Sequence, residues 1–93
     1  MTEIEILARD YPGDDAWQRF VSAYDSPQQE DLPKLSLDID ILQVTTNYFG
    51  NSQKAEDWLQ KELPPLGGAS VVEVFGDEVS GRNIVRHLLM RLP

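Results

Sequence analysis

The sequence predicts a small, mainly α-helical domain of about four to five helices, with one or two short extended strands in its first 40 residues. Apolar residues recur at spacings of three and four along several segments, which is typical of helices packed on a core. Glycine, proline and capping side chains separate these segments. A chain of 93 residues forms one folded unit. We divide it into an acidic N-terminal segment with one short helix, 1–33, and a helical domain, 34–93.

The N-terminal segment is predicted to contain one strand and one short helix. Over Thr2–Ala8 glutamates alternate with isoleucines, and this period of two indicates a half-buried strand. A Pro-Gly pair then interrupts the chain, after which Asp14 or Asp15 is expected to cap a helix. The apolar face of that helix consists of Trp17, Phe20, Val21 and Tyr24. The stretch 26–34 has two prolines and no helical period, so we interpret it as a linker.

An extended segment near 34–39 is expected to lead into a helix over residues 40–49. The alternation of apolar and polar residues favours extended backbone in the first part. Asp40 followed by Gln43 has the spacing of a capping box, which opens a helix. Gly50 is the expected end of that helix.

The next helix is expected over residues 52–63. Asn51 or Ser52 can cap its beginning, and a proline pair ends it at positions 64 and 65. Its apolar face consists of Ala55, Trp58, Leu59 and Leu63. We expect the tryptophan of this set to lie in the core.

The last part of the chain is predicted to form a turn and two helices. The turn is made by Leu66–Gly68, and Ser70 is expected to cap a short helix over 71–75. Asp77 is the expected cap of the final helix. The apolar side of the final helix consists of Val79, Ile84, Val85, Leu88, Leu89 and Leu92, and its arginines are Arg82, Arg86 and Arg91.

The charge of the chain is strongly negative. Sixteen acidic and eight basic residues give a net charge of −8, and ten of the acids lie in residues 1–40 with only three of the bases. Nucleic acids and anionic membranes bind through Lys and Arg, so both are disfavoured, whereas a basic protein partner is favoured. The acidic start lacks the basic residues of a secretory or transit peptide, and no apolar run reaches the roughly 18 residues of a membrane span. We therefore expect a cytoplasmic protein without a membrane segment.

The sequence predicts no catalytic, cofactor-binding or metal-binding residues, and therefore no enzyme. The absence of cysteine excludes disulfides, thiol nucleophiles and thiolate metal sites. The single histidine, His87, lacks the spacing of a metal motif and is interpreted as structural or surface-exposed. Adjacent acids on a helix point about 100° apart, so the acidic pairs do not converge on one substrate atom. The Gly-Gly pair is not followed by the lysine of a phosphate-binding loop.

The second half of the chain carries an ordered set of motifs. A Phe-Gly helix end precedes an Ala-x-x-Trp-Leu helix, a Leu-Gly-Gly turn, a short helix and a glycine early in the last helix. The positions are Ala55, Trp58, Leu59, Leu66, Gly67, Gly68, Ser70 and Gly81. In this order, residues 48–92 resemble the toxin-binding domain of the Xre/MbcA/ParS-type antitoxins. The resemblance implies a helical domain in which these residues build the fold.

The resemblance also implies a function and a partner. Antitoxins of this family bind RES-type toxins, which degrade NAD, and cover the entrance to the NAD site. We therefore expect an antitoxin or immunity protein whose partner is a RES-type toxin. The expected toxin-binding residues lie on the last helix and the tail, and they are Arg82, Arg86, Arg91, Leu92 and Pro93.

The sequence leaves two other functions open. One is a dimerising adaptor or regulatory binding module without a toxin partner, and a homo-oligomer is compatible with it. The other is a mimic of DNA that uses the acidic first 40 residues to compete for a basic target. Binding of DNA itself is not expected, because the acidic, proline-broken N-terminal segment contains no helix-turn-helix pattern and the net charge is −8.

Overall fold

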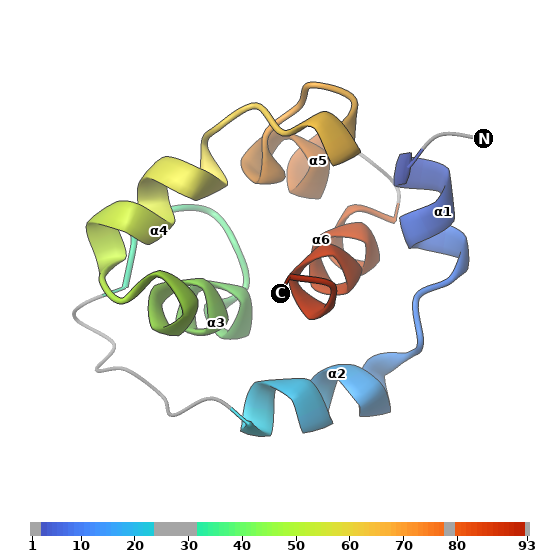
Figure 1. Cartoon of the computed structure of the whole chain (residues 1–93), viewed down its shortest axis with the longest axis horizontal. Helices are drawn as coiled ribbons and strands as arrows, with labels where there is room; N and C mark the ends of the chain where they lie inside the picture. The colour runs from blue at the N-terminus through green and yellow to red at the C-terminus, as the bar shows by residue number, and fades with distance from the viewer. Residues whose placement is uncertain (1–2, 24–31, 78–79, 93) are drawn as a thin grey trace.

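The computed structural model describes residues 3–23, 32–77 and 80–92, which form six α-helices and one 3₁₀ turn (Figure 1). In chain order these are α1 Glu3–Arg9, α2 Asp14–Ser22, α3 Ile39–Phe49, α4 Ser52–Leu59, η2 Pro64–Leu66, α5 Val71–Asp77 and α6 Gly81–Met90. The other helices surround α6, which packs against α1, α2, α3 and α5 (Figure 1). The predicted mainly helical fold is confirmed, with more helices than the four to five expected.

The strand expected over Thr2–Ala8 is wrong, because the described part of this segment, from Glu3 onward, belongs to helix α1. Glutamate and isoleucine alternate, as they would in a half-buried strand, only as far as Ile6. Ile4, Leu7 and Ala8 have the spacing of one helical face, and Leu7 is buried against α6 while the other two pack beside it. No β-strand occurs among the residues that the structure describes.

Helix α2 begins after a glycine rather than after a capping aspartate. Gly13 is the N-cap with a φ of 104°, and Asp14 and Asp15 both lie inside the first helical turn. The expected aspartate cap is therefore wrong, although negative charge in the first turn still favours the helix electrostatically. Trp17 on the predicted face is fully buried. Tyr24 and most of the predicted linker lie outside the described residues.

Helix α3 confirms the helix predicted over 40–49, but its first turn differs. Asp38 is the N-cap, so the expected capping box of Asp40 and Gln43 is wrong. The Asp40 carboxylate instead accepts hydrogen bonds from the backbone of Ile41 and from an indole nitrogen on α2. Gly50 ends the helix as predicted, with a φ of 92° that L-residues rarely adopt.

Helix α4 begins as predicted and ends early. The Asn51 side chain accepts a hydrogen bond from the backbone nitrogen of Lys54 at 2.8 Å. The helix stops at Leu59, and the proline pair starts the separate turn η2. Ala55 and Leu59 are fully buried, but Trp58 is only partly buried and stacks on Phe49 at a centroid distance of 5.3 Å. Trp58 therefore faces inward as expected, but it packs at the edge of the core and is not fully buried.

The turn at Leu66–Gly68 and the helix that follows it are both confirmed. Gly67 and Gly68 have φ angles of 69° and 90°. The backbone nitrogen of Glu73 donates to the Ser70 hydroxyl at 3.1 Å, and the backbone nitrogen of Ser70 donates to the Glu73 carboxylate at 3.3 Å. This reciprocal pair is a complete capping box for α5.

The start of α6 corrects the last expected cap. Ser80 is the N-cap, while Asp77 is the final residue of α5. The next residue, Gly81, is buried where α6 approaches α5 closely. A Cβ at this position would overlap the carbonyl oxygen of Val74 and lie 2.8 Å from that of Phe75. The glycine is therefore required for the packing of α5 against α6 rather than for a turn.

Candidate functional site

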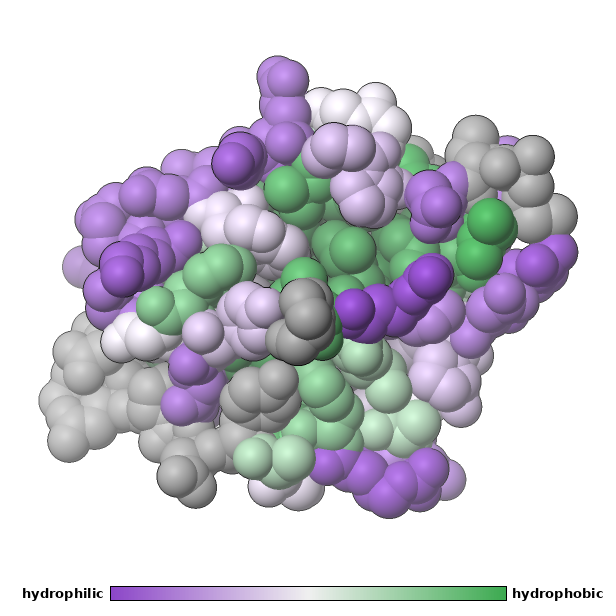
Figure 2. Space-filling model, in the orientation of Figure 1, coloured by the Kyte–Doolittle hydropathy of each residue, from purple (hydrophilic) through white to green (hydrophobic). Residues whose placement is uncertain are grey.

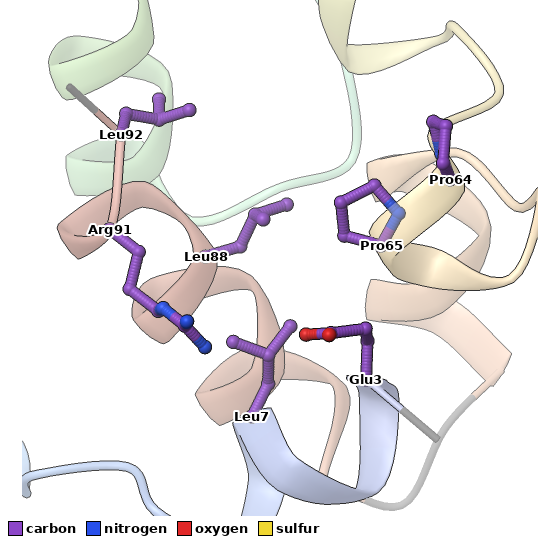
Figure 3. A pocket seen from close by; sticks show the side chains of 7 residues that line it. All are labelled: Glu3, Leu7, Pro64, Pro65, Leu88, Arg91 and Leu92. Carbon is purple, nitrogen blue, oxygen red and sulfur yellow. The ribbon is translucent and has the colours of Figure 1, made fainter.

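An open pocket of about 490 Å³ lies at the C-terminal end of α6, where α6 meets α1 and η2 (Figure 3). Its volume is in the range of sites that hold a small molecule or a side chain of a partner protein. Figure 2 shows apolar surface between α1 and α6, bordered by hydrophilic side chains. The residues that line the pocket are Glu3, Leu7, Pro64, Pro65, Leu88, Arg91 and Leu92.

The apolar part of the pocket comes from three elements. Leu7 on α1 and Leu88 on α6 are buried residues and form its floor, and Leu92 lies at its rim just after α6 (Figure 3). Pro64 and Pro65 are exposed on η2 and present their rings as a wall. A wall of proline rings loses little conformational entropy when a partner covers it, because the rings are already rigid.

The position of η2 follows from the local sequence. The backbone nitrogen of Leu63 donates to the carbonyl oxygen of Ala69, and that of Gly68 donates to the carbonyl oxygen of Leu63. These bonds close the chain into a tight loop that holds the proline pair at its tip. Leu66 is buried under the loop and anchors it to the core. The Leu-Gly-Gly motif therefore positions one wall of the pocket.

Two charged side chains of opposite sign border the apolar floor. In Figure 3 the Glu3 carboxylate and the Arg91 guanidinium extend toward each other across Leu7. Both residues are exposed, and neither forms a hydrogen bond or an ion pair with a residue that the structure describes. Within the described residues, neither charge is therefore taken up by an ion pair, and both are exposed to solvent.

The structure brings together only part of the expected toxin-binding set. Arg91 and Leu92 lie side by side at the pocket. Arg82 lies at the other end of α6, where its Nε is 2.7 Å from the Asp38 carboxylate. Pro93 lies outside the described residues. Arg86 is in the middle of the helix, and only 13% of its side chain is exposed.

Arg86 forms the centre of an internal polar cluster. One guanidinium nitrogen, Nη1, donates to the Asp14 carboxylate at 3.1 Å and to the Tyr11 hydroxyl at 3.4 Å. The other, Nη2, lies 3.8 Å from carboxylate oxygens of both Asp38 and Asp40. We call these five residues the Arg86 cluster. They join the N-terminal segment, α3 and α6, so the N-terminal segment is part of the same packed unit.

The protonation states of the Arg86 cluster follow from burial and from its charges. Burial alone lowers the pKa of Arg86, but the hydrogen bond with Tyr11 and the nearby carboxylates raise it above its ordinary value. The pKa of Tyr11 is also raised, chiefly because burial disfavours the phenolate. The cluster therefore contains a permanent cation and a neutral phenol at physiological pH.

His87 and most of the residues of the antitoxin-like motif have structural positions. The Nδ1 atom of His87 lies 2.9 Å from the carbonyl oxygen of Leu7, which joins α6 to the end of α1. The fully or nearly fully buried motif residues are Ala55, Leu59, Leu66, Ser70 and Gly81. His87 thus helps to hold Leu7 in the pocket floor.

Within the described ranges, no cluster of three or more His, Asp or Glu side chains has an arrangement that could hold a metal ion. The helices of that part of the chain are also too short or too polar for any of them to cross a membrane.

Sequence reasoning missed Glu3, Leu7 and the proline pair as site residues. Leu7 and Glu3 were assigned to a strand, and the prolines were interpreted only as a helix end. A signal was present, because Glu3 and Leu7 are four residues apart and share one face of a helix. The meeting of α1 with η2 depends on tertiary packing and has no local signal.

No protein-family profile, no curated protein and no solved structure matches this chain.

Proposed function

We propose that this protein is an antitoxin or immunity protein that inhibits a RES-type, NAD-degrading toxin by covering the entrance to its NAD site. One observation carries the proposal. Arg91 and Leu92, expected from the sequence to contact the toxin, lie together at an open apolar pocket. Interfaces usually concentrate their energy in a few side chains, among which arginine is over-represented.

The burial of the motif residues supports the same proposal. If Leu59, Leu66 and Ser70 carried an activity themselves, they would need access to a ligand, but all three are buried. Their part is to build the scaffold that presents the end of α6. The resemblance over residues 48–92 includes these buried scaffold residues, so the function depends on the residues that the scaffold exposes at the end of α6.

The proposal assigns different parts to the three arginines. Arg91 is exposed and unpaired among the described residues, so it is the arginine best suited to contact a toxin. Arg86 stabilises the fold through its cluster, and Arg82 is held by Asp38. We therefore place the centre of the toxin contact at Arg91, Leu92 and the adjoining pocket.

Co-expression tests the proposal in cells. The product of the gene adjacent to this one, which the proposal expects to be a RES-type toxin, is expressed alone and with this protein, and cellular NAD and growth are measured. We expect NAD to fall with the toxin alone, to stay at the control level with both proteins, and the two proteins to co-purify. Continued loss of NAD in the presence of soluble, folded protein would contradict the proposal and would favour the adaptor without a toxin.

A further inference from the structure

We infer that the pocket at the end of α6 accepts a projecting apolar side chain of the toxin, and that this side chain stands between a basic group that pairs with Glu3 and an acidic group that pairs with Arg91. This inference rests on the proposed function and deepens it. The tail of this protein covers the toxin, and the toxin in turn inserts a side chain into this protein.

The shape of the pocket favours a projecting apolar side chain of the partner. The surface is concave, so it is complementary to a convex group and not to a second copy of the same hollow. Leu7 and Leu88 form a buried floor, and Pro64 and Pro65 form a rigid wall. A group that enters gains the free energy of apolar burial without requiring these residues to rearrange.

The charges select the neighbours of the apolar group. Glu3 and Arg91 border the same floor from two different helix ends, and neither forms a hydrogen bond or an ion pair with a described residue. The pKa of the Asp10 carboxyl is lowered chiefly by its hydrogen bond with Arg9, and in smaller part by the charge of Arg91, which is close enough to act on it. A purely apolar partner would remove water from both charged groups without giving either a hydrogen-bonded partner at contact distance, which is costly. A partner segment with a basic and an acidic group on either side of the apolar one satisfies both.

The charge of the whole chain agrees with this choice and opposes self-association. Two copies with a net charge of −8 repel each other, whereas a basic partner is attracted. Glu3 places one of these negative charges directly at the pocket. The occupant is therefore a segment of a different protein rather than a second copy.

Charge reversal tests the inference on the purified product of the adjacent gene, which the proposed function expects to be a RES-type toxin. The variants are Glu3→Lys, Arg91→Glu and the double variant that carries both. Matched controls are Asp15→Lys and Arg19→Glu, which change the charge by the same amounts on α2, away from the pocket. The dissociation constant is measured by calorimetry, and circular dichroism verifies the fold of each variant.

Each pocket variant is expected to weaken binding by about tenfold to a hundredfold, because it places like charges opposite each other in the interface. The two controls are expected to change it by less than about threefold. The double variant decides between two uses of these charges. If Glu3 and Arg91 served only to attract each other, exchanging them would restore wild-type affinity. If each pairs with the toxin, the exchange weakens binding at least as much as either single change.

The outcomes separate the inference from the proposed function. Binding by the wild type with no effect of either single variant, or restoration by the double variant, overturns the inference and leaves the antitoxin function intact. Failure of the wild type to bind the toxin overturns both. A second readout is a selection for toxin mutations that restore inhibition by Glu3→Lys. We expect them to replace a basic residue next to an exposed apolar one, and suppressors elsewhere on the toxin would contradict the assignment.

Discussion

The guanidinium carbon of Arg86 on α6 lies 5.4 Å from the centre of the Trp17 ring on α2. The indole nitrogen of Trp17 in turn donates a hydrogen bond of 2.8 Å to Asp40 on α3. A cation over the face of a tryptophan is attracted by the ring. The pair therefore links three helices from both halves of the sequence. It also explains why Arg86, which was expected at the toxin contact, is held inside the fold.

Replacing Arg86 by methionine is expected to destabilise the protein by about 2–4 kcal/mol. Arg86→Met keeps a long side chain but leaves Asp14 and Asp40 without their cation. Asp38 keeps its ion pair with Arg82. Arg82→Met is the matched control, because Arg82 forms an exposed ion pair that contributes less than about 1 kcal/mol. Urea denaturation followed by circular dichroism measures both. Equal losses from the two variants would contradict the central position of Arg86.

The two tryptophans are expected to differ in their contributions to stability. Trp17→Ala removes a fully buried ring and is expected to cost about 3–5 kcal/mol. Trp58 is partly buried against Phe49, so Trp58→Ala is expected to cost only about 1–2 kcal/mol. Thermal melting of the two variants compares them directly. A larger loss for Trp58→Ala than for Trp17→Ala would contradict this order of the two contributions.

Two glycines near the α5–α6 junction are expected to respond to alanine in opposite directions. Gly81→Ala places a Cβ against the backbone of α5, so the helices must separate and the cost exceeds about 2 kcal/mol. Gly76→Ala, inside α5, meets open space and is expected to stabilise by up to about 1 kcal/mol. Chemical denaturation gives both values. A neutral Gly81→Ala would show that α5 and α6 do not pack this closely.

The features predicted correctly from the sequence depend on a few neighbouring residues. Asn51 and Ser70 cap their helices through bonds to a backbone nitrogen three residues away, and Gly50 ends α3 through its own φ angle. These signals act locally and can be recognised in a linear sequence. The same rules failed at Asp14 and Asp40, because each carboxylate binds a side chain from a distant helix instead.

The candidate site was predictable only in part. Arg91 and Leu92 follow from the resemblance and from their place at the end of an amphipathic helix. Glu3 and the proline pair belong to the site because α1 and η2 meet beside α6 in the tertiary structure. Helix α1 is not evident from the sequence, because its first few residues alternate between glutamate and isoleucine as the residues of a half-buried strand do. Its helical character is decided by packing against α6.

Binding kinetics are expected to distinguish the contribution of the pocket from that of negative charges elsewhere on the protein. Arg91→Ala combined with Leu92→Ala is expected to raise the dissociation rate of the toxin complex by about tenfold or more, since it removes contacts made only in the complex. Neutralising Glu62 and Asp77 together is expected to slow association and weaken its salt dependence, with little change in dissociation. Asp14 is left intact because it binds Arg86. Surface plasmon resonance at several salt concentrations measures both rates. Wild-type rates for the variant that combines Arg91→Ala with Leu92→Ala would contradict the placement of the toxin contact at these two residues.

The most direct measurement of the proposed function is the rate of NAD degradation by the purified toxin as this protein is added. We expect the rate to fall linearly and to reach zero near a stoichiometric amount of wild-type protein, as for a tight inhibitor that covers the active site. Arg91→Glu is expected to require a large excess, while Arg19→Glu follows the wild type. Undiminished NAD degradation in the presence of excess folded wild-type protein would contradict the account.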